Sequence, residues 1–157
     1  MFRRILVPLE HTATDETILS YIRPLARECR SKLVLIHVAD GWVARNIQPL
    51  ELRESEEMKD DRTYLQQLCA TLQAEGFACE AVFAAGEPAK EIAAVADRER
   101  CDLIAMATHG HRGLNDLVLG SVASQLRHIT MVPVLMVRVK KQEASRGNVE
   151  EKRLGGS

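Results

Sequence analysis

The sequence is poor in aromatic residues and carries almost no net charge. Its 157 residues include one Trp, two Tyr and three Phe, which is too few for a surface on which nucleic-acid bases stack. The 21 Lys and Arg residues nearly balance the 22 Asp and Glu residues, so no overall positive field attracts nucleic acid or anionic lipid. We therefore expect neither a nucleic-acid-binding protein nor a membrane-bound one.

Long apolar runs and paired cysteines are also missing. The first apolar run, Ile5–Val7, stops at Pro8 and is too short for a signal peptide or a membrane span. This favours a cytoplasmic location. The four cysteines form no Cys-x-x-Cys pair and lie in segments with regular periodicity, so we expect reduced, mostly buried thiols. They are Cys29, Cys69, Cys79 and Cys101.

Short apolar runs alternate with amphipathic stretches along the chain. The run Lys32–Val38 is almost continuously apolar, which suits a strand buried on both faces of a parallel sheet. The alternation predicts a single α/β domain with right-handed crossovers. The expected strands are residues 4–7, 32–38, 79–85, 101–107 and 132–137. Four helices are expected between and after them: one that begins near a cap at Thr12 or Thr14, one over residues 51–75, one that begins near Pro88, and one over residues 118–129.

Three local features refine this pattern. The charged run from Glu54 to Arg62 is expected to be a solvated helix face. The last strand, Val132–Val137, contains Pro133, which cannot donate a ladder hydrogen bond on one side and so places the strand at a sheet edge. An apolar edge strand promotes association, so we expect a homodimer through Val132–Val137, with a covering tail as the alternative. Residues 139–157 are polar and aperiodic, and we expect them to be disordered.

A glycine-rich stretch, Met106–Ser121, separates the fourth expected strand from the last expected helix. It contains Gly110, Gly113 and Gly120. Glycine lets backbone N–H groups approach an anion, and a helix N-terminus adds unpaired donors and a favourable dipole. The stretch therefore predicts a phosphate-binding loop, although a tight turn and a helix cap would explain the same residues.

The residues around this loop do not indicate fast catalysis. No Gly-Lys-Ser/Thr sequence follows it, and Ser121 does not lie in a Gly-x-Ser-x-Gly elbow. Without a lysine at the phosphates or an evident water-orienting base, we expect slow nucleotide hydrolysis at most. His109 and His111 form a His-x-His pair, but no nearby carboxylate or cysteine completes a metal site. His109 is expected to shape the loop, and His37 to lie in the core or face a turn.

Residues 4–138 resemble the universal stress protein family in three segments. These are ILVPLE at residues 5–10, GEPAKEI at residues 86–92, and residues 108–121 followed by 132–138. Nucleotide-binding members show Gly, two residues, Gly, nine residues, then Gly with Ser or Thr. This chain keeps the spacing from Ala107 through Gly110 to Gly120-Ser121, but Ala107 replaces the first glycine, and Glu10 replaces a usual Asp. The methyl of Ala107 would strain a backbone with positive φ and be tolerated where only close approach is needed.

The resemblance implies an adenine nucleotide alpha hydrolase-like, Rossmann-like fold. The sheet would be parallel and five-stranded, with order 3-2-1-4-5 and helices on both faces, in a domain spanning residues 1–138. It also implies a dimeric stress-response regulator that binds ATP, AMP or ADP, with Mg²⁺ on the phosphates. A nucleotide-free interaction module and a slow ATPase are the alternatives.

The same resemblance implies a nucleotide at the carboxyl ends of strands one and four, where open α/β sheets bind ligands. Adenine would be flanked by Pro8, Leu9, Glu10 and Val38. The ribose and phosphates would be bordered by Gly110, His111, Arg112 and Gly113, in the loop that also holds Ala107 and His109. Phosphate oxygens would accept from the backbone N–H groups of Gly120, Ser121 and Val122 and from the Ser121 hydroxyl.

Overall fold

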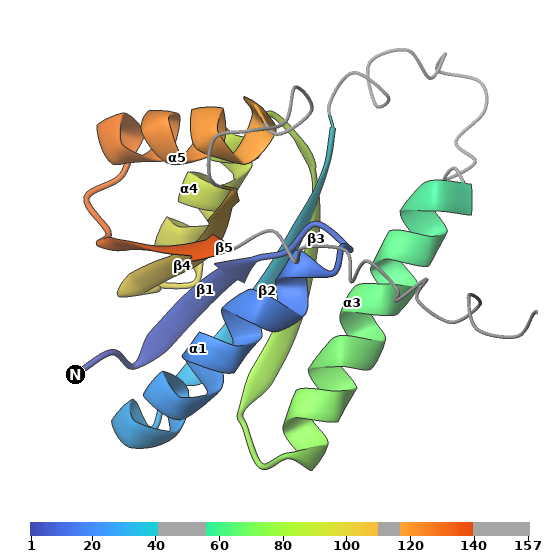
Figure 1. Ribbon diagram of the computed structural model, residues 1–157, viewed down its shortest axis with the longest axis vertical. Coiled ribbons are helices and arrows are strands. Elements are labelled where there is room, and N and C mark those ends of the chain that lie inside the picture. The colour runs from blue at the N-terminus through green and yellow to red at the C-terminus, as the bar shows by residue number, and fades with distance from the viewer. Residues whose placement is uncertain (41–55, 110–116, 140–157) are drawn as a thin grey trace, which may run out of the picture.

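The computed structural model of the chain describes residues 1–40, 56–109 and 117–139. A parallel five-stranded sheet with the order β3-β2-β1-β4-β5 forms its centre (Figure 1), which confirms the expected topology. The strands are β1 (Arg4–Pro8), β2 (Lys32–Asp40), β3 (Cys79–Gly86), β4 (Leu103–His109) and β5 (Val134–Val139). The helices are α1 (Thr14–Cys29), α3 (Glu56–Ala74), α4 (Pro88–Arg98) and α5 (Leu117–Ile129).

Helices cover both faces of the sheet, and the central strand is buried on both sides. Ile5 and Val7 of β1 belong to the core beneath α1 and α3, whereas Leu6 belongs to the core beneath α4 and α5. The two helix pairs lie on opposite sides of the sheet in Figure 1. All three side chains are fully buried, which is why this strand has a continuous apolar sequence instead of alternating polar and apolar residues.

The last two strands begin two residues later than the sequence predicts. Cys101 lies three residues beyond the end of α4 and is tied to it, because its N–H donates to the carbonyl of Ala96. Asp102 precedes β4, and its carboxylate accepts the N–H groups of Arg3 and Arg4. Pro133 precedes β5, which lies at a sheet edge as expected and runs through Val139. Residues 140–157, the rest of the expected tail, lie outside the described residues.

The start of α1 differs in part from expectation, whereas the end of α3 and the start of α4 agree with it. Ala13, and neither Thr12 nor Thr14, occupies the N-cap of α1 and makes no side-chain cap hydrogen bond, but the N–H of Thr14, the first residue of the helix, donates to the hydroxyl oxygen of Thr12 at 3.4 Å. Gly76 follows α3 with a φ of 94° and donates its N–H to Gln73, and Pro88 lies in the first turn of α4. Residues 51–55 of the expected long helix lie outside the described residues.

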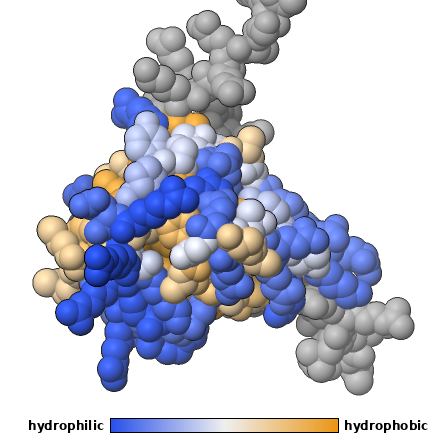
Figure 2. All heavy atoms as spheres, turned by 90° about the horizontal axis from the view of Figure 1, so that it is seen from below, coloured by the Kyte–Doolittle hydropathy of each residue, from blue (hydrophilic) through white to orange (hydrophobic). Residues whose placement is uncertain are grey.

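Charged groups cluster at the amino ends of the strands. The guanidinium of Arg4 lies 3.2 Å from Glu99 and 3.5 Å from Glu80, and Lys32 pairs with Glu80. The hydrogen bond from Lys32 lowers the pKa of Glu80. Figure 2 views the molecule from this end and shows hydrophilic residues over most of it, around a smaller apolar area. The amino ends are thus occupied by paired charges.

All four cysteines are free, and Cys69, Cys79 and Cys101 are buried. Burial raises the pKa of Cys101 to about 11, so this thiol is protonated at neutral pH. Of the helices in the described residues, none has the length and apolar character needed to cross a membrane.

Candidate functional site

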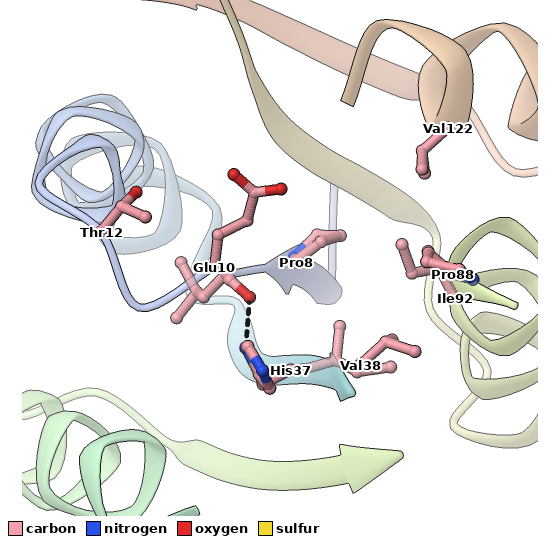
Figure 3. A pocket seen from close by; sticks show the side chains of 10 residues that line it. Pro8, Glu10, Thr12, His37, Val38, Pro88, Ile92 and Val122 are labelled. Atoms are coloured by element: carbon pink, nitrogen blue, oxygen red, sulfur yellow. Dashed lines mark hydrogen bonds between the residues drawn. The ribbon is translucent and has the colours of Figure 1, made fainter. Parts of the chain in front are cut away.

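A cavity of about 290 Å³ lies at the carboxyl ends of β1 and β2 (Figure 3). Its size is at the lower end of the range of about 300–1,000 Å³ typical of small-molecule pockets. Its walls come from four places: the β1–α1 turn, the end of β2, the first turns of α4, and α5. The lining residues are Pro8, Leu9, Glu10, Thr12, Ile36, His37, Val38, Pro88, Ile92 and Val122.

The sheet topology explains why space opens here. From β1 the chain crosses to β2 on one side, and from β3 it crosses past β1 to β4 on the other. Connections that leave in opposite directions create a crevice at the carboxyl ends of the strands. The register widens it, because β1 pairs with β2 as far as Pro8 but with β4 only at Ile5 and Leu6. Beyond Leu6, the two central strands are free to diverge.

Five of the residues expected to contact a nucleotide line this cavity. Pro8, Leu9 and Glu10 enter it from the end of β1, Val38 from β2, and Val122 from α5 on the opposite wall (Figure 3). The loop residues Gly110, His111, Arg112 and Gly113 lie outside the described residues. His109 ends β4, and only its backbone is described.

Ala107 occupies the family's first glycine position without backbone strain. Among the described non-glycine residues, positive φ occurs at His11, Arg30 and Arg100, and Ala107 is not one of them. Its side chain is buried with Val7 and Val137 in the core beneath α1 and α3, whereas Val122 belongs to the core on the other face. The methyl therefore points away from the α5 side of the sheet, and this position does not require glycine for its conformation.

The start of α5 bears on the three expected backbone contacts to phosphate. The helix begins at Leu117, so Gly120, Ser121 and Val122 lie within its first two turns. In an α-helix the unpaired N–H groups are those of the N-cap and the first three residues, which here precede Gly120. These three residues therefore follow the positions whose N–H groups an α-helix leaves unpaired, and Ser121 is exposed. The side chain of Val122 contributes an apolar wall instead.

Asp15 holds the β1–α1 turn that carries Glu10. The aspartate is only 3% exposed, and its carboxylate accepts the N–H groups of Glu10 at 3.0 Å and His11 at 2.9 Å. It also accepts the hydroxyl of Tyr64 on α3 at 2.9 Å. His11 has a φ of 60°, a left-handed conformation that these bonds stabilise. Burial raises the pKa of Tyr64, and the neighbouring Asp15 carboxylate raises it further.

A second carboxylate also contacts the turn. It belongs to Asp61 of α3, and it joins the turn to β2. Its two oxygens lie 2.7 Å from Nδ1 of His11 and 3.2 Å from Nε2 of His37. The other ring nitrogen of His37 lies 2.9 Å from the carbonyl oxygen of Leu9 (Figure 3). The Asp61 side chain is only 16% exposed, so the expectation of a solvated charged face was wrong at this residue. Its position on the inner side of α3 brings it against the turn.

Sequence reasoning missed half of the cavity wall. Pro88 and Ile92 enter it from α4, although they lie in a segment that the family resemblance had already singled out. Thr12, Ile36 and His37 come from the turn and from β2. Their neighbours Leu9 and Val38 were expected there, so the position of these elements was the available signal. Within residues 1–40, 56–109 and 117–139, no group of three His, Cys, Asp or Glu residues could hold a metal ion.

Comparisons with known proteins agree with this architecture. A model of the universal stress protein family matches residues 1–138. Universal stress protein MJ0577 of Methanocaldococcus jannaschii is 23% identical over 157 residues, covering 89% of this chain and 97% of the relative. A solved structure of MJ0577 has a TM-score of 0.71 at 26% identity and covers 89% of this chain and 98% of its own.

Two further solved structures share the fold and contain an adenine nucleotide. A universal stress protein in complex with cAMP has a TM-score of 0.64 at 17% identity, covering 87% of this chain and 97% of its own. A universal stress protein from Archaeoglobus fulgidus in complex with dAMP has a TM-score of 0.61 at 19% identity, covering 85% of this chain and 96% of its own. At these identities, the likeness is one of fold.

Proposed function

This chain belongs to the universal stress protein family, and from that premise we propose that it binds an adenine nucleotide in the cavity at the carboxyl ends of β1 and β2. The observation that carries the proposal is the lining of that cavity, where five residues expected to contact a nucleotide meet from three separate elements. Structures of the same fold in complex with cAMP and dAMP support the ligand class.

The cavity suits the base end of such a ligand. Pro8, Val38, Pro88, Ile92 and Val122 offer apolar surface to the faces of a purine. The carboxylate of Glu10 can accept a hydrogen bond from the adenine amino group or a ribose hydroxyl. The phosphates would extend toward the start of α5, because the N-terminus of a helix favours an anion, and Ser121 lies in the second turn of that helix. ATP with Mg²⁺, ADP, AMP and cyclic forms are all candidates.

We further propose that nucleotide binding regulates a cytoplasmic homodimer. The edge strand β5 leaves Leu135 37% exposed and Met136 58% exposed, and the preceding Met131 is fully exposed. An apolar sheet edge of this kind favours pairing with a second copy. A ligand can shift the dimer between two states only if it binds them with different affinities. Slow ATP hydrolysis remains the alternative activity.

A matched pair of cavity variants tests the proposal. Val38→Phe places a ring in the cavity, whereas Val82→Phe places it one strand away, on β3, where Val82 packs against the same core without lining the cavity. Thermal-shift assays with millimolar ATP, ADP, AMP and cAMP, with and without Mg²⁺, should show stabilisation of the wild type and of Val82→Phe and none of Val38→Phe. Nucleotide should also be found in the supernatant of the denatured wild-type protein.

Two results would contradict nucleotide binding. The first is a wild-type protein that releases no nucleotide and shows no thermal shift with any of the four ligands, which would favour the nucleotide-free interaction module. The second is equal stabilisation of both phenylalanine variants, which would move the binding site away from this cavity. Melting curves without ligand establish that both variants are folded.

A further inference from the structure

We propose that His11 is a positioning residue for the Glu10 carboxylate, and that α3 sets its place through Asp61 and Tyr64. The inference rests on the proposed function, because Glu10 lies in the wall of the same cavity. None of the other three residues is among those that line the cavity. The helix α3 therefore governs nucleotide affinity through residues that do not touch the ligand.

Glu10 is the cavity residue whose placement matters most for a polar contact with the ligand. Among the described residues that line the cavity it is the only carboxylate, and its side chain projects from the turn beside Pro8 (Figure 3). The strength of a hydrogen bond depends steeply on its distance and angle. The carboxylate can therefore accept from an amino group or a hydroxyl effectively only if the turn holds its backbone in place.

The next residue, His11, has an unusual backbone conformation. Its φ is 60°, in the left-handed region that residues other than glycine seldom adopt. Such a conformation persists where the surrounding structure holds it, and it is frequent at ligand-binding sites. The peptide unit between Glu10 and His11 is planar, so a rotation of the His11 backbone moves Glu10 with it.

Two side chains of α3 hold the ring of His11. Its Nδ1 forms a hydrogen bond of 2.7 Å with a carboxylate oxygen of Asp61. The ring also stacks on that of Tyr64, with the centroids 4.0 Å apart and the planes inclined by 16°. The His11 side chain is 39% exposed, so its removal leaves no hole in the core. Loss of the contact should therefore change the turn more than the fold.

Asp15 holds the same turn by its backbone. Its carboxylate accepts the N–H groups of Glu10 and His11 and the hydroxyl of Tyr64. The backbone angle φ relates the N–H of a residue to its Cα–Cβ bond. Asp15 fixes the N–H of His11 and α3 fixes its side chain, so the two contacts together determine φ. Without the contact to α3, the hydrogen bonds to Asp15 leave this rotation open.

A matched pair of glycine variants separates the His11 side chain from its backbone. Glycine adopts a positive φ without strain, so His11→Gly keeps the turn conformation accessible and removes the link to α3. Arg30→Gly makes the same change at the exposed C-cap of α1, where φ is 54°. In calorimetric titrations with adenosine and AMP, affinity should fall about tenfold in His11→Gly and stay within about twofold of wild type in Arg30→Gly.

Asp61→Ala tests the same link from α3 and leaves the sequence of the turn intact. Asp61→Asn is the conservative variant, because its amide can donate or accept and so pair with either tautomer of His11. It should recover most of the affinity that the alanine variant loses. Asp60→Ala, at the exposed neighbouring position, is the control and should bind like the wild type. An Asp61→Asn protein as weak as Asp61→Ala overturns the proposed link.

A double-mutant cycle distinguishes positioning from a general loss of stability. Glu10→Gln removes the charge of the acceptor and should weaken adenosine binding about tenfold in the wild type and in Asp60→Ala. In Asp61→Ala the carboxylate is already displaced, so the same substitution should weaken binding less than about threefold. A tenfold loss in both backgrounds means that the two residues act independently, which overturns the proposal. Melting curves verify that each variant is folded.

The proposed function and the positioning role fail in different ways. If neither adenosine nor AMP binds the wild type, nucleotide binding is contradicted, and the role of His11 is contradicted with it. If the wild type binds both ligands and His11→Gly binds them equally well, nucleotide binding stands and the positioning role alone is overturned.

Discussion

Replacing Asp15 with asparagine should destabilise the fold and disturb the turn that carries Glu10. The buried carboxylate accepts three hydrogen bonds of 2.9–3.0 Å, from the N–H groups of Glu10 and His11 and from the Tyr64 hydroxyl. Asparagine keeps one acceptor oxygen, but it replaces the other carboxylate oxygen with an N–H₂ group, which faces the groups that donated to that oxygen. It also removes the negative charge that strengthens all three bonds. Losing one hydrogen bond to a charged group costs about 1.5–3 kcal/mol.

We therefore expect the free energy of unfolding to fall by about 2–3 kcal/mol, and the melting temperature by roughly 5–10 °C for a chain of this size. Urea unfolding monitored by circular dichroism measures the first quantity. Asp97→Asn, at an exposed position of α4, should change stability by less than about 0.5 kcal/mol. An Asp15→Asn variant as stable as this control would refute the view that the carboxylate organises the turn.

Three further changes test other parts of the structure. Ala107→Gly should lower the free energy of unfolding by about 1–2 kcal/mol, because a buried methyl is lost and the backbone becomes freer. Its nucleotide affinity should stay within about twofold of wild type. A complex that is tenfold tighter would mean that the methyl obstructs the ligand. Met136→Glu, at a 58% exposed position of β5, should give a folded monomer in light scattering, and a persisting dimer would place the interface elsewhere. Burial raises the pKa of Cys101 to about 11, so the rate of its alkylation in the folded protein should rise about tenfold per pH unit between pH 8 and 10. In urea, the alkylation rate of the unfolded chain should level off near pH 9. A rate in the folded protein that levels off at the same pH would contradict the raised pKa.

The sequence was sufficient to predict the succession of strands and helices because most elements carry their own local signals. Lys32–Val38 is too continuously apolar for a half-exposed strand, and Pro88 and Gly76 mark the start of α4 and the end of α3. The strand order came from the family resemblance, since no single segment specifies its neighbours. The starts of β4 and β5 were misplaced because Cys101 and Val132 are apolar residues that complete connections before each strand begins.

The walls of the cavity were predicted where the family resemblance located a residue, which it did at the end of β1 and at Val38 and Val122. Leu9 and Glu10 follow directly from the end of β1, so the resemblance located them together. Asp15, Asp61 and Tyr64 look like ordinary polar residues of amphipathic helices, and their roles depend on α3 packing against the β1–α1 turn. Because Asp61 lies 50 residues from His11 in the chain, nothing in the local pattern distinguishes it from its exposed neighbour Asp60.

The most direct measurement of the central claim is an NMR titration of ¹⁵N-labelled protein with AMP. If an adenine nucleotide occupies the cavity, the backbone amides of Leu9, Glu10, Val38 and Val122 should shift in a saturable way. The amides of Arg3, Lys32 and Asp102, at the amino ends of the strands, should stay unchanged. Shifts confined to those amino ends, or none at millimolar AMP, would contradict the proposed site.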